Sequence, residues 1–308
     1  MSETPLDRPF AALGIRLMAI FFLAVMTAMV KLAGEHGVSL LETMFYRNAL
    51  SLPLILAFVL AGPGVRSLKT THMMGHFTRS AVGLIGMVFT FGAYMLLPLA
   101  EATTIGFTTP IFATIAAVLF LNEKVRAHRW SAVIIGFIGV LLVTRPGSGS
   151  IPLFGACVAL GSALIIAIIS ILLRQLGRTE SAITTVFYFA SFGALVTGAL
   201  LGLATFMGGK WSAYSFHMHN HAAWVALIGL GISGAIGQVA LSASLRYGAV
   251  STIIAMDYSN LIWATIFGWF LFGQLPAPTT WTGAPIIIAS GLYIAWREHR
   301  RATQSQRV

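Results

Sequence analysis

The chain has 308 residues, of which 57% are hydrophobic and only 9% are charged. Soluble domains carry about 25% charged residues, so this composition excludes a water-soluble globular fold and predicts a chain solvated mainly by lipid. The net charge of +10 alone would suggest nucleic acid, but in a membrane protein the placement of Lys and Arg among the loops matters more than their total. We therefore expect a lipid bilayer, and no nucleic acid, among its partners.

Ten apolar segments follow one another along the chain, each near the length that crosses a bilayer. Because unpaired backbone N–H and C=O groups are costly in lipid, we expect an all-α integral membrane protein with ten transmembrane helices. The expected spans are Ala11–Ala33, Val38–Ala61, Met74–Leu97, Leu99–Leu121, Arg129–Val143, Ile151–Leu173, Ala182–Phe206, Ala222–Leu245, Val250–Phe272 and Thr280–Trp296.

The basic residues sort by side of the membrane. With the N-terminus in the cytoplasm, fifteen of the nineteen Lys and Arg residues lie inside, and three lie outside: Lys31, Arg145 and Lys210. Since cytoplasmic loops carry the excess of Lys and Arg, we expect a multi-pass protein of the cell inner (plasma) membrane with both termini cytoplasmic. The remaining basic residue, Arg47, lies in the middle of the second span.

Part of the fourth span recurs in the ninth. The stretches TTIGFTTPIFATI (residues 103–115) and AMDYSNLIWATIF (residues 255–267) share the pattern Ile-x-Ala-Thr-Ile at an offset of 151 residues. A second match, Thr-x-Phe-Tyr at residues 43–46 and 185–188, has an offset of 142. These matches predict two five-helix repeats, residues 1–147 and 148–308.

Five is an odd number of spans, so the two repeats are expected to run through the membrane in opposite directions. Inverted repeats recur in secondary transporters, where two related bundles open a shared midplane site to each side in turn. This organisation predicts alternating access around a central cavity. The alternative is a gene duplication without alternating access.

Two stretches resemble the signature of the drug/metabolite transporter superfamily, in its ten-span exporter branch built from two EamA repeats. They are LPLAEATTIGFTTPIFATIAAVLFLNEKVRAHRWSAVIIGFIGVLLVTRPG (residues 97–147) and LRYGAVSTIIAMDYSNLIWATIFGWFLFGQLPAPTTWTGAPIIIASGLYIA (residues 245–295). The resemblance covers nearly the whole chain and implies a transporter. It does not imply the substrate, because relatives move amino acids, riboflavin, S-adenosylmethionine, metallophores and drugs. The family pattern matches Pro110 and Glu123, whereas the second copy has Leu261 and Gln274, so the halves are not equivalent.

Ionisable groups inside lipid are costly unless they face protein or water, so each is a hypothesis for a functional site. Asp257, in the ninth span beside Tyr258 and Asn260, is the deepest acid. It is a candidate to bind a substrate amine or to carry a coupling proton, and Glu101 is a second proton-coupling candidate. Tyr258 and Asn260 are candidates for substrate binding. Alternatively, Asp257 forms a structural pair with a neighbouring helix.

Arg47 is a candidate to hold a substrate carboxylate or phosphate, because a guanidinium binds such groups in bidentate fashion. The alternative is that Arg47 neutralises Asp257 or Glu101. His76 and Arg79, at the cytoplasmic start of the third span, are interpreted as interfacial side chains. Alternatively, a substrate entering from the cytoplasm would meet them.

The fourth span carries a polar stripe. Glu101, Thr104 and Thr108 occupy positions i, i+3 and i+7 and share one helix face, so they are candidate substrate-binding residues. Pro110 is expected to bend the helix and to free the carbonyl of Gly106 as a ligand acceptor. A threonine that bonds back to its own helix would make the kink purely structural.

Two further polar residues lie in the eighth span. Gln238 and Ser242, at i and i+4, are candidates to line the cavity, while the glycines around them are expected to serve helix packing. The HMHNH stretch, residues 217–221, falls in an outer loop. Alternate histidines can bind zinc or copper, but with no adjacent acid or cysteine we interpret the stretch as a solvated loop.

No catalytic motif is present: the chain lacks a nucleotide-binding glycine loop, HExxH and GxSxG. We therefore expect no enzyme activity, no cofactor, no metal site and no ATP-driven pump. The expected function is secondary active export of a small metabolite such as an amino acid, amine or related compound, with possible proton coupling, by a monomer or homodimer. The alternatives are an uptake carrier for a cofactor-like metabolite of the riboflavin or S-adenosylmethionine type, and an intramembrane enzyme with Asp257 as base.

Overall fold

The computed structural model describes residues 9–121, 127–145, 151–177, 179–247 and 256–305. These residues form helices and no strand, which confirms the expected all-α class for the described part of the chain. The helices are α1 (Pro9–Glu35), α2 (Leu40–Ala61), α3 (Met73–Leu96), α4 (Leu99–Gly106), α5 (Thr109–Leu121), α6 (Ala127–Thr144), α7 (Leu153–Leu176), α8 (Ala182–Met207), α9 (His221–Tyr247), α11 (Asn260–Phe272) and α12 (Pro278–Ser305), with short 3₁₀ helices η1 (Val65–Leu68) and η2 (Gly209–Tyr214).

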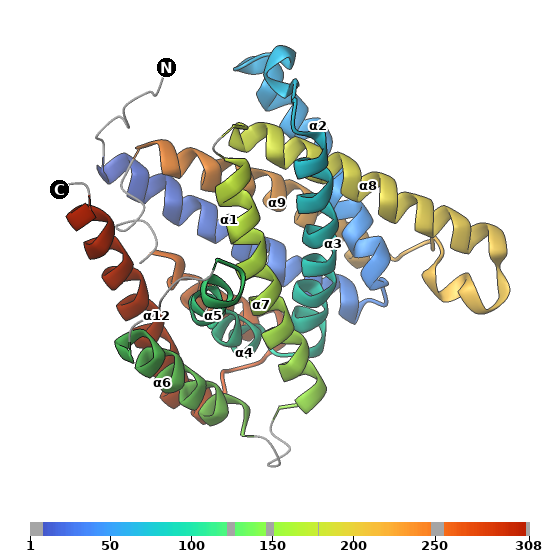
Figure 1. The fold of residues 1–308 in the computed structure, drawn as a ribbon. Coiled ribbons are helices and arrows are strands. Elements are labelled where there is room, and N and C mark those ends of the chain that lie inside the picture. The colour runs from blue at the N-terminus through green and yellow to red at the C-terminus, as the bar shows by residue number, and fades with distance from the viewer. Residues whose placement is uncertain (1–8, 122–126, 146–150, 178, 248–255, 306–308) are drawn as a thin grey trace.

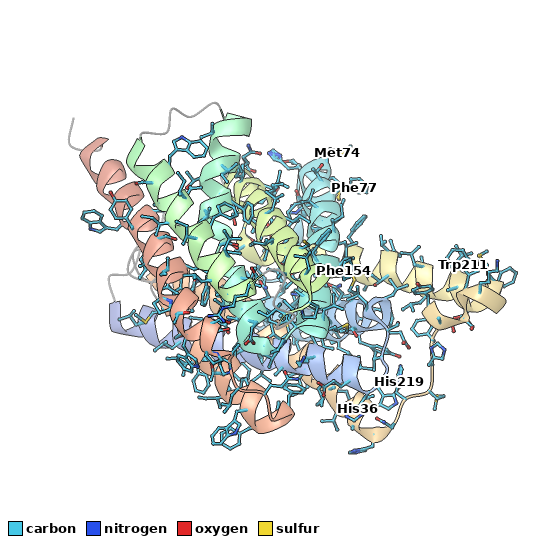
Figure 2. The ribbon with its side chains drawn as sticks, turned by 90° about the horizontal axis from the view of Figure 1, so that it is seen from below. His36, Met74, Phe77, Phe154, Trp211 and His219 are labelled. Atoms are coloured by element: carbon cyan, nitrogen blue, oxygen red, sulfur yellow. The ribbon has the colours of Figure 1, made fainter. Side chains whose placement is uncertain are left out.

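Six of the described helices are long and apolar enough to cross a bilayer: α1, α2, α3, α7, α8 and α9. Two shorter apolar stretches lie in α6 and α11. The expected fourth span is divided between α4 and α5. Large apolar side chains, including those of Met74, Phe77 and Phe154, point outward from the helices (Figure 2) and are 74%, 53% and 70% exposed. A surface of this kind requires lipid as its solvent.

The helices pair across the middle of the sequence. The most extensive contacts join α1 to α9, α3 to α7, α2 to α8 and α6 to α12 (Figure 1). Each of these pairs takes one helix from before residue 145 and one from after residue 151. The two sequence halves are therefore interleaved along their length. The described start of α1 and the end of α12 lie on the same side of the molecule, at the left of Figure 1.

Two helices begin with the same serine cap. Ser39 precedes α2 and accepts a hydrogen bond from the Glu42 N–H, while Ser181 precedes α8 and accepts one from the Thr184 N–H. A serine at this position satisfies one of the backbone donors left free at a helix start. Ser39 and Ser181 are separated by the same 142 residues as the Thr-x-Phe-Tyr match.

The α6 and α12 helices approach closely because glycines face each other. A Cβ on Gly139 would lie 3.1 Å from the Gly283 carbonyl oxygen, and a Cβ on Gly283 would lie 2.6 Å from that of Gly139. Small residues permit such backbone contact between membrane helices. The expected fifth and tenth spans thus pack on each other.

Candidate functional site

The fourth span is broken rather than bent. α4 ends at Gly106 and α5 begins at Thr109, so Phe107 and Thr108 lie between two helices. Thr108 Oγ1 donates to the Ile105 carbonyl at 2.7 Å, and Thr109 Oγ1 donates to the Gly106 carbonyl at 2.8 Å. The expectation of a free Gly106 carbonyl is therefore wrong, because a neighbouring hydroxyl occupies it. The bonds of both threonines back to the preceding turn match the structural alternative for this kink.

A matching break precedes α11. The Ser259 N–H donates to the Met256 carbonyl in a turn, and α11 begins at Asn260. Tyr258 and Ser259 lie 151 residues after Phe107 and Thr108. The Phe107 and Tyr258 rings touch edge to face, with centroids 4.9 Å apart, and α4 packs on α11. The two polar interruptions of the sequence are thus adjacent in space.

Polar atoms without partners gather on these two helices. Thr104 Oγ1 on α4, Ser259 Oγ before α11 and Asn260 Oδ1 at its start are buried and have no hydrogen-bond partner among the described residues. Buried polar groups are almost always paired, since an unpaired one costs about 1–3 kcal/mol. A polar ligand or water bound between α4 and α11 would remove that cost.

Glu101 lies at the start of α4, buried to 2% exposure. Its Oε1 accepts from the Ala277 N–H at 2.8 Å and from Thr280 Oγ1 at 3.2 Å, while its Oε2 is buried without a partner. The carboxylate therefore sits at the N-terminus of α12, where the helix dipole favours negative charge. Nearby, Lys31 Nζ donates to the Leu97 carbonyl at 2.9 Å.

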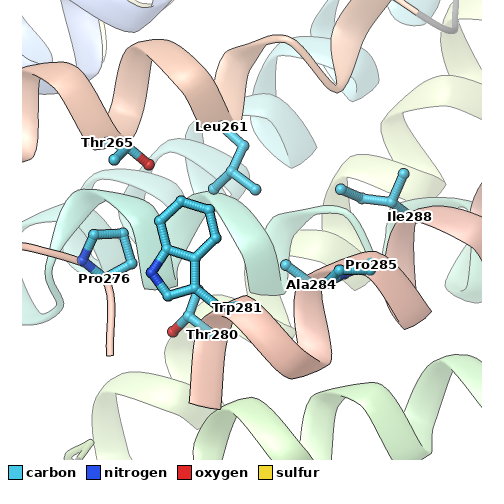
Figure 3. Close-up of a pocket in the computed structure, with 8 residues that line it drawn as sticks. All are labelled: Leu261, Thr265, Pro276, Thr280, Trp281, Ala284, Pro285 and Ile288. Atoms are coloured by element: carbon cyan, nitrogen blue, oxygen red, sulfur yellow. The ribbon is translucent and has the colours of Figure 1, made fainter. Parts of the chain in front are cut away.

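A hollow of about 110 Å³ lies beside Thr280, between α11 and α12 (Figure 3). Its lining is almost wholly apolar: Leu261, Thr265, Pro276, Thr280, Trp281, Ala284, Pro285 and Ile288. Of the residues predicted to bind substrate, none lines this hollow. The hollow is connected to Glu101 through Thr280, which lines it and donates a hydrogen bond to Glu101 Oε1.

Asp257 forms a bidentate ion pair with Arg16. Arg16 Nε donates to Oδ1 at 2.7 Å and NH2 donates to Oδ2 at 2.6 Å, while NH1 lies 3.5 Å from Ser244 Oγ. The pair ties α1 to the segment before α11, and the Asp257 side chain remains 41% exposed. The expectation that Arg47 neutralises Asp257 is wrong, because Arg16 takes that place. Nothing in the sequence linked positions 241 residues apart.

Arg47 is buried among α2, α8 and α9. Its NH1 donates to Asn48 Oδ1 at 3.0 Å, and its guanidinium lies over the Phe189 ring, 5.3 Å from the centroid. It therefore pairs with neither Asp257 nor Glu101. Arg79 lies over the same ring at 4.0 Å, with Nε and NH1 buried and unpartnered. The Arg79 side chain as a whole is half-buried, so its interpretation as an interfacial side chain stays a prediction.

Gln238 is half-buried on α9. Ser242 lies on the same helix, but its side chain is outside the residues described. The predicted packing of glycines in this helix is present: a Cβ on Gly231 would meet the Leu50 side chain at 2.5 Å, and one on Gly234 would meet Met26 at 3.0 Å.

The HMHNH stretch, residues 217–221, folds over a buried acid. The His217 N–H donates to Glu42 Oε1 at 3.1 Å, and His219 Nε2 lies 2.9 Å from the same oxygen. Glu42 is fully buried, and its Oε2 also accepts from Ser39. The interpretation as a solvated loop is wrong for His219, whose side chain is only 6% exposed. We call Ser39, Glu42, His217 and His219 the Glu42 cluster.

A second acid joins the start of α8 to the start of α3. Thr70 Oγ1 donates to Glu180 Oε1 at 2.6 Å, and His76 Nε2 lies 3.5 Å from Oε2. The Thr70 hydrogen bond, with a smaller contribution from His76, holds the pKa of Glu180 below its ordinary value. Tyr188 stacks on His76 with ring centroids 4.6 Å apart. We call Thr70, His76, Glu180 and Tyr188 the Glu180 cluster.

Comparison with known proteins identifies the family. The model of the EamA-like transporter family matches the chain twice, over residues 10–145 and 153–296. The chain belongs to the EamA-like transporter family. This membership confirms the resemblance to the drug/metabolite transporter superfamily and, with the apolar helices, indicates a multi-pass membrane protein with a transporter function.

Several relatives of the chain are transporters. A riboflavin transporter of Vibrio cholerae is 27% identical over 89% of each chain, and the pseudopaline exporter CntI of Pseudomonas aeruginosa is 26% identical over 90% of this chain and 93% of its own. An S-adenosylmethionine uptake transporter of Rickettsia bellii is 28% identical over 84% of each chain. A solved crystal structure that is 19% identical shares the fold, with a TM-score of 0.57 over 91% of this chain and 96% of that one.

Sequence reasoning missed the partners of the predicted residues. Arg16 and Arg79 were sorted as inner-side charges, although both lie within expected spans. Their depth was the available signal, because a charge several residues inside an apolar segment requires a protein or ligand partner. Glu42 and Glu180 carried no such signal, since both lie near helix starts where acids are common.

Proposed function

We propose that the chain is a secondary transporter that exports a small metabolite, such as an amino acid, amine or related compound, by alternating access. The main support is the contact between the two helix breaks. There Thr104, Ser259 and Asn260 have buried polar atoms with no hydrogen-bond partner among the described residues. A soluble ligand with hydrogen-bonding groups satisfies such atoms, whereas lipid tails do not. We therefore propose a substrate site between α4 and α11, with Tyr258, Thr108 and Pro110 in its wall.

The proposed architecture is ten transmembrane helices in two inverted five-helix repeats, residues 1–147 and 148–308. The double family match supports it, as do the shared serine caps. If α1 corresponds to α7 and α3 to α9, exchanging the halves converts the α1–α9 contact into the α3–α7 contact, and both occur. Related contacts made in both directions are expected of a pseudo-two-fold axis in the membrane plane. With the N-terminus inside, both termini are cytoplasmic.

Proton coupling is assigned to Asp257 and Glu101. The Asp257 side chain is 41% exposed, and among the described residues Arg16 binds its carboxylate. Protonation of its carboxylate would remove the charge that Arg16 neutralises, and would release α1 from the segment before α11. Glu101 Oε2 has no hydrogen-bond partner in the described part of the chain, so a proton or a substrate amine would bind there without displacing a described group.

The Glu42 and Glu180 clusters supply the proposed closures. The first joins α2 to the segment before α9, and the second joins α8 to the segment before α3. In the inverted arrangement they lie at opposite membrane faces, the Glu42 cluster outside and the Glu180 cluster inside. Alternating access then requires one cluster to separate while the other stays closed.

Counterflow in proteoliposomes tests this function. Thr104→Val should abolish uptake of labelled solute while raising the melting temperature, because it removes an unsatisfied buried hydroxyl without changing the shape of the side chain. Thr197→Val is the matched control, since Thr197 is equally buried but donates to the Gly193 carbonyl of its own helix. Full counterflow in Thr104→Val would remove α4 from the substrate site.

Uptake is the second candidate direction, because one relative is named an S-adenosylmethionine uptake transporter. A cofactor-like metabolite of this type, or of the type carried by the riboflavin transporter, is then the candidate substrate. Both directions use the same site. Right-side-out and inverted vesicles carrying an imposed pH gradient distinguish them. Solute accumulation only in inverted vesicles with an acidic interior indicates proton-coupled export, and accumulation only in right-side-out vesicles with an acidic exterior indicates uptake.

A further inference from the structure

Two arginine side chains from different helices meet at one aromatic ring. Arg47 of α2 and Arg79 of α3 each hold a guanidinium over Phe189 of α8. Arg47 is the eighth residue of α2 and Arg79 the seventh of α3, so both lie about two helical turns from the nearer helix end. The pair belongs to the interior of the helical bundle rather than to its ends.

Neither cation has its hydrogen bonds completed. Arg47 is 5% exposed, and its guanidinium donates to the neutral side chain of Asn48. Arg79 Nε and NH1 are buried and have no hydrogen-bond partner among the residues that the structure describes. A buried charge without a counterion costs several kcal/mol, and two like charges close together repel each other. An anion bound close to both groups would offset these costs.

The described acids do not supply that anion. Those engaged elsewhere are Glu42 with the outer histidines, Glu101 with α12, Glu180 with Thr70 and Asp257 with Arg16. Among the acids whose side chains the structure describes, the remaining one is Glu35, which is exposed at the end of α1. None of these described carboxylates therefore pairs with either guanidinium group.

Glycines keep the space around both groups free of side chains. A Cβ on Gly83 would lie 3.2 Å from Arg79 NH1 and 2.7 Å from the Phe189 ring, and one on Gly234 would lie 3.7 Å from Arg47 Nε. A methyl group at Gly83 would therefore displace Arg79 or the ring.

We propose that Arg47 and Arg79 together bind the anionic group of the transported solute, which assigns a carboxylate- or phosphate-bearing metabolite as the substrate class. This inference rests on the proposed transport function. A guanidinium presents its donors as a planar fork that matches two oxygens of a carboxylate or phosphate, and two such forks match an oxyanion better than a single cation does. Phe189 separates the forks from the apolar surroundings and must shift when the anion enters.

Thermal unfolding of the full chain in non-ionic detergent tests the pair. The probes are sodium phosphate and sodium acetate, each compared with sodium chloride at equal ionic strength. The wild type should be stabilised by phosphate or acetate in a saturable manner. Arg47→Gln and Arg79→Gln should each weaken the apparent affinity about tenfold or more, as expected for loss of a charge-assisted hydrogen bond. Arg79→Lys, which keeps the charge but not the fork, should weaken it less.

The control is Arg66→Gln, because Arg66 is exposed in η1; it should retain the wild-type response. Without added anion, the Arg47 and Arg79 variants should melt no lower than the wild type, since each loses an uncompensated buried charge. That result shows that they are folded. Wild-type responses in both variants, or no anion-dependent stabilisation of the wild type, would overturn the inference.

A lipid headgroup is the other source of a phosphate. The same proteins in nanodiscs of phosphatidylcholine and of phosphatidylglycerol separate the two sources. A stabilisation by phosphatidylglycerol that both arginine variants lose, with no response to the free anions, would assign the pair to lipid and overturn the substrate assignment. Counterflow of a neutral solute that Arg79→Gln leaves intact would overturn the inference but not the transport function. Anion binding without counterflow of any solute would leave the site and refute transport.

Discussion

The Glu42 and Glu180 clusters occupy corresponding places in the two halves, but different groups hold their carboxylates. Each joins a helix that begins with a serine cap, α2 or α8, to the segment that enters the helix it packs beside, α9 or α3. Glu42 is fully buried and bound by two histidines and a backbone N–H. Glu180 lies just before its cap and is bound chiefly by the hydroxyl of Thr70. The two clusters thus make related contacts with different chemistry, so under the proposed alternating access they should close with unequal strength.

The largest effect is expected at Glu42. Glu42→Ala removes the capping box and leaves His219 buried without its partner, so we expect a loss of about 3 kcal/mol in the free energy of unfolding. Reversible unfolding in mixed detergent micelles measures it. Glu35→Ala is the matched control, because Glu35 is exposed at the end of α1. Equal free energies of unfolding for the Glu42 and Glu35 variants would show that the Glu42 cluster does not stabilise the fold.

A functional effect follows from disrupting the Asp257 pair. Asp257→Asn keeps the size of the side chain but fixes it in a neutral form, so flux should no longer respond to a pH gradient while counterflow at equal pH persists. Glu180→Gln serves as the comparison, because that acid belongs to the Glu180 cluster and has no assigned coupling role. Undiminished pH-driven flux in Asp257→Asn would end the assignment of the proton site.

A smaller loss of stability is expected from a change in the Glu180 cluster. Thr70→Val removes a neutral hydroxyl that donates to Glu180, and a typical hydrogen bond contributes about 1 kcal/mol. Thr78→Val is the control, since Thr78 is exposed and donates to its own helix. A loss at Thr70 as large as that at Glu42 would remove the contrast between the two faces.

The smallest effect is a change with pH. The Thr70 hydrogen bond lowers the pKa of Glu180 below its ordinary value of 4.5. A depressed pKa means that the stabilisation is present at neutral pH and is lost as pH falls through the folded-state value, below 4.5. The stability difference between wild type and Thr70→Val should therefore shrink in that acid range. A difference that stays constant down to pH 3 would exclude Glu180 as the acceptor that matters.

The sequence predicted the features that depend on local pattern. Low charge and long apolar segments predicted the helices, and the repeated stretches at residues 103–115 and 255–267 predicted two polar interruptions, which the structure brings together at Phe107 and Tyr258. Pro110 indicated an irregular fourth span. Its position in α5, after two threonines that bond back to the preceding turn, explains a complete break instead of a bend.

Pairings across long sequence separations were not predictable. Arg16 reaches Asp257 over 241 residues and His219 reaches Glu42 over 177 residues. Composition and periodicity carry no information about which helices become neighbours, so the alternative that Arg47 neutralises Asp257 or Glu101 was wrong. That error arose because the depth of a charge within a span does not reveal which side chains pack around it.

The proposed alternating access depends most on the two repeats running through the membrane in opposite directions. Cys157 is the sole cysteine, so a Cys157→Ser background allows one position at a time to be labelled. His36→Cys lies between α1 and α2, and Thr179→Cys lies in the corresponding link between α7 and α8. A membrane-impermeant maleimide applied to intact cells should label position 36 readily and position 179 only after permeabilisation. Labelling of both positions in intact cells, or of neither, would contradict the inverted arrangement.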